Sequence, residues 1–79
     1  MPVVFHYGAY KFFFYSNEGN PREPMHIHVR SSDGEAKFWV NPLSVAESFG
    51  FGARTLRELT RVVEENHNLI ERAWHEHFA

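Results

Sequence analysis

Two histidines and an arginine occupy alternate positions in segment 24–30, which reads PMHIHVR. Successive side chains of a β-strand point to opposite faces, so His26, His28 and Arg30 would share one face and the intervening isoleucine and valine the other. The apolar pair predicts a core on one side of this strand. The basic trio then lies on a surface or in a site, where imidazole and guanidinium groups can bind anions, ligate metal or transfer protons.

Phosphodiester cleavage is the first chemistry that this face would permit. Alternate residues of a strand lie about 6.5–7 Å apart, so His26 and His28 could flank one phosphate as acid and base. Arg30 and Lys37 would stabilise the negative charge that develops, and Trp39 could stack on a base. These residues are the candidate catalytic set of a ribonuclease.

Metal binding is a second chemistry, because His26 and His28 can converge on one divalent ion from the same face. Structural zinc takes four protein ligands and catalytic zinc at least three. His6 would complete the set only if the hairpin predicted for residues 3–15 lies beside the histidine strand. Glu35 would do so only if the turn that follows this strand folds back beside it. No cofactor is expected, and a divalent metal remains an option.

Binding without catalysis requires the fewest assumptions. The binding face would comprise His26, His28, Arg30, Lys37, Trp39 and Tyr15. Such a surface suits an acidic protein partner or RNA. A structural role is an equal alternative, in which the histidines cover the sheet and are hydrogen-bonded to the loop 16–24.

Other polar residues are weaker candidates. Glu18 and Arg22 lie in the loop that leads into the histidine strand, but solvated loop charges explain them more simply. His67, Glu71 and His75 recur at four-residue steps on a predicted helix. We expect them to form a solvated edge rather than a set of ligands.

Two hairpins would position the histidine strand. Segments 3–7 and 10–15 flank Gly8-Ala9, and segments 26–30 and 36–40 surround a predicted Asp33-Gly34 turn. The first register pairs Tyr7 with Tyr10, Phe5 with Phe12 and Val3 with Phe14 on a core side, and His6 with Lys11 and Val4 with Phe13 on a partly wet side. The second register pairs Arg30 with Lys37, Val29 with Phe38 and His28 with Trp39.

The rest of the chain completes an α+β fold. Segment 44–49 is expected to return as a fifth strand, although a short helix also fits its spacing. Apolar residues from 53 onward follow steps of three and four, which predicts helices over about 53–66 and 68–78, with a kink or break at Asn66-His67-Asn68. The prediction is an antiparallel sheet of four or five strands with one kinked or two C-terminal helices packed on one face.

Length and composition are those of one small domain, 1–79, with a sheet part (1–49) and a helical part (53–78). The core must come from eight Phe, three Tyr and two Trp, because only 79 residues are present. Without cysteine, neither disulfides nor thiolate zinc sites can form, and a reducing cytoplasm is expected. No signal peptide or membrane-length segment is seen, and a net charge of −2 argues against general nucleic-acid binding.

Several sequence blocks resemble one prokaryotic family. They are FFFYSNEG (12–19), PMHIHV (24–29), GEAKFW (34–39) and a late Trp74. In this order and spacing they are similar to the family catalogued as domain of unknown function 4160. Members of that family often lie beside a second small family in operons that look like toxin–antitoxin modules. Gly52 is a mild departure, because Ser or Asn is common there as a helix N-cap.

The resemblance implies a small operon-encoded protein partner and no established activity. We therefore expect a cytoplasmic binding component of a toxin–antitoxin-like pair, acting through the His/Arg/Lys/Trp face on a partner protein or RNA. The alternatives are a ribonuclease toxin that uses His26 and His28, and a metal-binding protein that uses the same histidines. A homo-oligomer is also left open, and no membrane association is expected.

Overall fold

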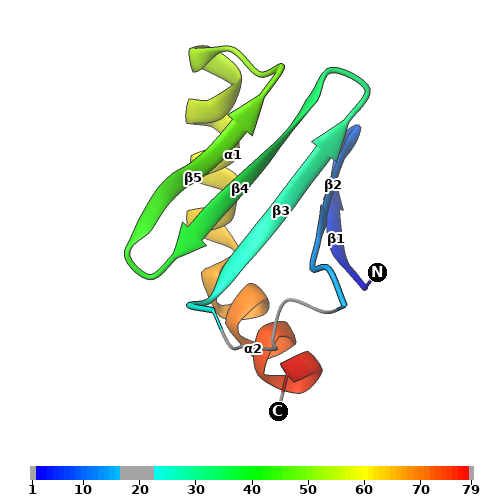
Figure 1. Ribbon diagram of the computed structural model, residues 1–79, viewed down its shortest axis with the longest axis vertical. Coiled ribbons are helices and arrows are strands. Elements are labelled where there is room, and N and C mark those ends of the chain that lie inside the picture. Colours follow the sequence, from blue (N-terminus) through cyan, green and yellow to red (C-terminus); the bar gives the residue numbers. More distant parts are fainter. Residues whose placement is uncertain (1, 17–22, 79) are drawn as a thin grey trace.

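A five-stranded antiparallel sheet followed by two helices forms the molecule (Figure 1). The computed structural model describes residues 2–16 and 23–78. The elements are β1 (Val3–Tyr7), β2 (Tyr10–Phe13), β3 (His26–Ser31), β4 (Gly34–Val40), β5 (Leu43–Phe49), α1 (Ala53–Glu65) and α2 (His67–Phe78). The strands lie in sequence order, and both helices lie on one side of the sheet, with α2 extending past its end (Figure 1). The predicted α+β class is confirmed, with a fifth strand over the expected segment.

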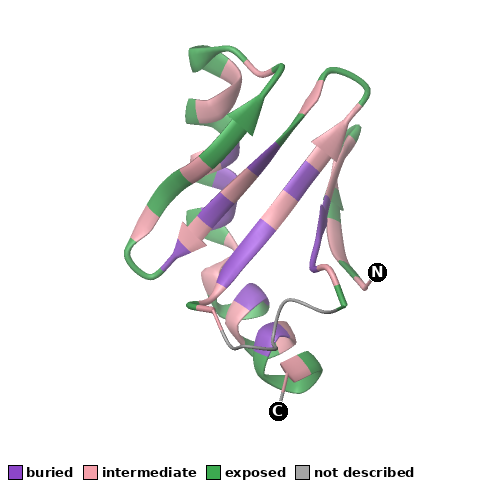
Figure 2. Ribbon diagram, in the orientation of Figure 1, coloured by how far each residue is buried: buried purple, intermediate pink, exposed green. Residues whose placement is uncertain are grey.

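The core lies between the helices and one face of the sheet. Burial alternates along β4, as expected for a strand covered on one side (Figure 2). The sheet contributes Ile27, Val29 and Phe38, and α1 contributes Leu59 and Val63, all of them fully buried. His28 and Arg30 alternate with Ile27 and Val29 along β3 and therefore point to the opposite face of the sheet.

The first hairpin follows the predicted register only near its turn. Gly8 has a positive φ of 55°, and the pairs Tyr7–Tyr10, His6–Lys11 and Phe5–Phe12 form as expected. A β-bulge then shifts the register, so that Val3 lies opposite Phe13. The predicted Val3–Phe14 and Val4–Phe13 pairs are wrong because the bulge inserts an extra residue into β1. Val3 is consequently 45% exposed, whereas Val4 packs against the core.

The second hairpin turns at Ser32-Asp33 rather than at Asp33-Gly34. Arg30 lies opposite Glu35, His28 opposite Lys37 and His26 opposite Trp39, so the predicted register is wrong by two residues. Gly34 belongs to β4, where a Cβ atom would collide with the carbonyl oxygen of Phe49. Glycine is needed there for close approach to the end of β5, and not for the turn. A shift of two residues leaves every side chain on its predicted face.

The helical part breaks where the sequence predicts. Asn66 lies between α1 and α2, and its side-chain Nδ2 donates to the carbonyl oxygen of Val62 at 2.8 Å. This bond satisfies a carbonyl group at the end of α1. Gly52 occupies the N-cap of α1 without a side-chain hydrogen bond. Neither helix in the described part of the chain is long and apolar enough to cross a bilayer.

Candidate binding face

The side of the sheet that faces away from the helices carries most of the predicted site residues. We call this surface the open face and define it by Tyr15, His28, Arg30, Lys37 and Trp39. Strands β3 and β4 place the last four at alternate positions, and Tyr15 follows β2. All five are partly exposed. The structure therefore brings these five predicted residues together on one surface.

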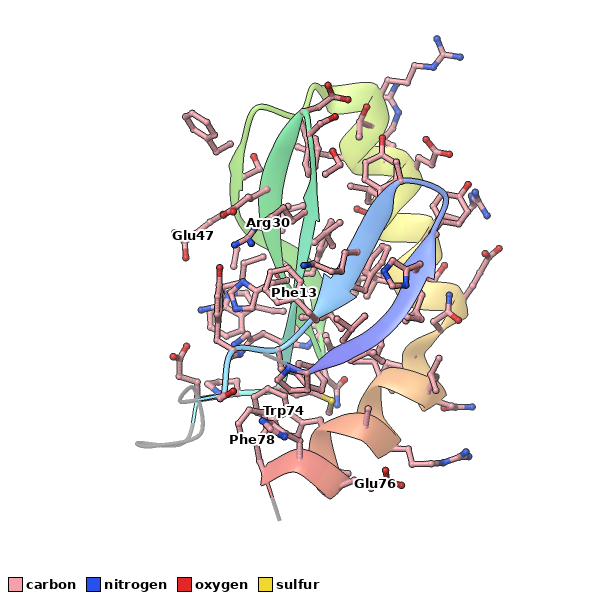
Figure 3. All side chains as sticks on the ribbon, turned by 90° about the vertical axis from the view of Figure 1, so that its right-hand side faces the viewer. Phe13, Arg30, Glu47, Trp74, Glu76 and Phe78 are labelled. Carbon is pink, nitrogen blue, oxygen red and sulfur yellow. The ribbon has the colours of Figure 1, made fainter. Side chains whose placement is uncertain are left out.

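The open face is built on a buried aromatic ring, Phe13, which is only 1% exposed. His28 stacks on this ring at 5.6 Å between centroids, and Tyr15 meets it edge-on at 5.2 Å. Arg30 lies beside Phe13 (Figure 3), with its guanidinium carbon 5.1 Å from the ring centroid. The Lys11 Nζ atom lies 5.5 Å from the same centroid. The predicted register of the first hairpin places Phe13 on a partly wet side instead. The run Phe12-Phe13-Phe14 held the missed signal, because consecutive strand residues cannot all face one core.

The charged residues of the open face are held by specific partners. Arg30 Nε donates to a carboxylate oxygen of Glu35 at 2.6 Å, and one terminal nitrogen donates to the Tyr15 hydroxyl at 2.8 Å. The bond to Glu35 raises the pKa of the Arg30 guanidinium above its ordinary value. Lys37 Nζ donates to Glu23 at 3.1 Å and lies 4.4 Å from the centroid of the Trp39 ring. The face is therefore ordered and close to charge-balanced.

His26, by contrast, is fully buried. Its ring lies 5.1 Å from that of Trp74, 5.7 Å from that of Trp39 and 5.2 Å from that of His28. Its Nδ1 atom is 2.9 Å from the carbonyl oxygen of Pro24. Because β3 begins at His26, where α2 brings Trp74 against the end of the sheet, this histidine is shielded from solvent. The structural alternative, a hydrogen bond to the loop 16–24, describes His26 well.

A shallow cavity of about 220 Å³ opens on the same side of the sheet. Tyr15, His28 and Lys37 line it together with Glu47 and Phe49 of β5. The two β5 residues are not among the predicted site residues. The alternation of Glu47 with Phe49 could have indicated them, but their position beside Lys37 depends on the pairing of β5 with β4.

The possible metal ligands do not come together. Among residues 2–16 and 23–78, no group of three or more His, Cys, Asp or Glu side chains is placed to hold an ion. His6 lies opposite Lys11 on the first hairpin, and Glu35 is bonded to Arg30. His67, Glu71 and His75 lie on α2, outside the open face. The secondary candidates Glu18 and Arg22 fall outside the described residues.

Comparison with known proteins identifies one family. The model of the family described as Domain of unknown function (DUF4160) matches residues 9–75. This range includes β2 to β5, α1 and most of α2, and with them the whole open face. No curated protein and no solved structure matches the chain.

Proposed function

The chain belongs to this family of domains of unknown function, and on that premise we propose that it is a cytoplasmic binding protein whose open face docks a small partner protein. The partner would be the other half of a toxin–antitoxin-like pair, as the operon arrangement of this family implies. One observation carries the proposal. The helices leave the open face uncovered, while internal bonds already hold its arginine, lysine and aromatic side chains in place.

Pre-ordering favours binding because side chains that are already immobilised lose little conformational entropy on association. Arginine, tyrosine and tryptophan are also the residue types that most often dominate binding energy at protein interfaces. Arg30, Tyr15 and Trp39 supply all three types on one surface. The open face therefore has the composition of an interface centre.

The charge balance favours a protein partner over RNA. Binding to a phosphate backbone depends on cations that release counterions. Here Arg30 is bonded to Glu35 and Lys37 to Glu23, so two of the cations of this face are already neutralised. RNA remains the alternative partner, with the nucleic acid meeting Trp39 and Tyr15 by stacking.

The ribonuclease alternative has less support than protein binding. An acid–base pair at a phosphodiester needs both imidazoles within reach of the substrate. His26 is fully buried between Trp39 and Trp74, so a substrate on the open face would meet His28 alone.

Co-expression with the product of the neighbouring operon gene tests the proposal. The tagged chain is purified, and the affinity for this candidate partner is measured by calorimetry for wild type and for Arg30→Ala. Because truncation removes a central arginine, we expect a loss of about tenfold or more in affinity. A complex that disappears on nuclease treatment would instead point to RNA.

Arg72→Ala is the matched control, because Arg72 is an exposed arginine on α2. It should bind the partner as wild type does. Thermal unfolding of both variants checks that each is folded. Equal affinities for the Arg30 and Arg72 variants would rule out the open face as the interface.

A further inference from the structure

The edge of the sheet at β5 has the features of a second docking site. β5 is the last strand in the sheet order, so its outer row of N–H and C=O groups meets no strand in the described part of the chain. The strand reads LSVAESF and contains neither proline nor lysine, two residues that commonly block pairing at an edge. Its only charged residue is Glu47, and its pairing with β4 has one irregularity, between the partners of Lys37 and Phe38. We infer that this edge binds an extended peptide by strand addition, with basic and apolar side chains alternating along the peptide.

Two hollows flank β5, one on each face of the sheet. On the open side, the 220 Å³ cavity is lined by Glu47, Ser48 and Phe49. On the helix side, a groove of about 550 Å³ is lined by Val45 with Leu56 and Thr60 of α1. Side chains of an added strand would point alternately into these two spaces. Peptide recognition by strand addition uses this arrangement, in which the main chain gives affinity and alternate side chains give specificity.

The helix-side groove offers an added strand an apolar surface, which is bordered by the charged side chains of Arg57, Arg61 and Glu64. Val45 is 41% exposed at its entrance, although its strand partner Phe38 is fully buried. Leu56 lies in the groove and packs against the hydrophobic core. Apolar side chains of the peptide would cover Val45 and Leu56 and remove this surface from water.

The open side requires a cation. Glu47 is the cross-strand neighbour of Lys37, but Lys37 donates to Glu23 and lies over Trp39 instead. Glu47 therefore makes no ion pair with any residue that the structure describes, and it projects from the side of the sheet away from the helices (Figure 3). Phe49, two positions on, is 81% exposed. A lysine or arginine opposite Glu47 would meet both a carboxylate and the face of a ring.

A separate peptide fits this edge better than a second copy of the chain does. A register shift places Val45 opposite Phe38 and Glu47 opposite Lys37, so Ala46 is an extra residue in β5. Val45 and Glu47 consequently lie on opposite faces of the sheet. Two copies of β5 would have to match the extra residue of both strands as well as their faces, whereas a regular peptide has to accommodate only one extra residue. A pairing of two copies centred on Glu47 would also place two carboxylates opposite each other.

Synthetic peptides test the inference on the full chain. The probe is an end-capped seven-residue peptide of alternating lysine and valine, and a glutamate–valine peptide is its control. We expect the first to shift backbone amide resonances along Ser44–Phe49 in NMR titrations and to slow hydrogen exchange there. The second should do neither. Perturbations confined to β1 or α2, or no perturbation by the lysine–valine peptide, would overturn the inference.

Two further comparisons separate strand addition from simple charge attraction. Two versions of the probe, one with every lysine and one with every valine N-methylated, should differ in their affinity for the chain. The reason is that only alternate residues of an added strand direct their N–H groups toward β5. Equal binding of the two would contradict strand addition. Glu47→Lys should weaken binding of the probe about tenfold, since attraction becomes repulsion.

Glu76→Lys, on the exposed side of α2 and far from β5 (Figure 3), is the charge-matched control and should bind as wild type does. A dimer in light scattering whose β5 amides are already protected without peptide would show a second copy at this edge. That result would also overturn the inference.

Discussion

Phe13 lies on the side of the sheet that carries the charged residues, yet it is almost completely buried. Its cover consists of side chains that each have a polar end, among them Tyr15, His28 and Arg30. Their apolar parts lie over the ring while their polar groups remain at the surface. The position of the open-face residues therefore depends on this ring beneath them.

Phe13→Ala should lower the free energy of unfolding by about 3 kcal/mol, because a large buried ring is replaced by a cavity. Urea denaturation followed by fluorescence measures the change. Phe49→Ala is the matched control, since Phe49 is 81% exposed, and it should change stability by no more than about 0.5 kcal/mol. Similar losses for the two variants would contradict the view that Phe13 anchors the open face.

His26 and His28 show why identical residue types on one strand can have different environments. Their alternation was visible in the sequence, and so was the face that they would share. The burial of His26 depends on Trp74, which lies 48 positions later and contacts it only because α2 reaches the end of the sheet. No local pattern contains that contact, so the sequence predicted the open-face set without separating His26 from it.

At the scale of elements, periodicity predicts which strands and helices form. Tertiary contacts decide the register in which the strands pair. Alternation gave the strands, and steps of three and four gave α1 and α2 with the break at Asn66. The second turn was misplaced because Asp33-Gly34 fits a common turn sequence, whereas Gly34 is required for its approach to Phe49. The bulge in β1 likewise follows no local sequence pattern, because Val3-Val4-Phe5 reads as a regular strand.

Gly34→Ala should destabilise the protein by about 2 kcal/mol, because the added methyl group meets the backbone of Phe49 and Gly50 rather than a flexible side chain. Thermal unfolding measures the loss. At Gly52, a Cβ atom would meet nothing within 4 Å, so Gly52→Ala should cost about 0.5 kcal/mol through weaker capping alone. If both variants unfolded at the same temperature, the close approach of β4 to β5 would not be the reason for glycine at position 34.

At the scale of the whole molecule, induced expression separates the binding function from the ribonuclease alternative. We expect total RNA to remain intact when the chain alone is expressed, because a buried His26 leaves the histidine pair incomplete at the surface. Electrophoresis of total RNA, beside growth curves, measures this. Growth arrest with RNA cleavage, both lost in His26→Ala and His28→Ala chains that still fold, would establish the ribonuclease instead.

The sequence order of the elements has a consequence for synthesis on the ribosome. Each strand pairs with its neighbour in sequence, so the five-stranded sheet can assemble hairpin by hairpin as the chain emerges. The helices that cover its apolar face are made afterwards. A nascent chain that ends before α1 would therefore expose Ile27, Val29 and Phe38 to water and to other nascent chains.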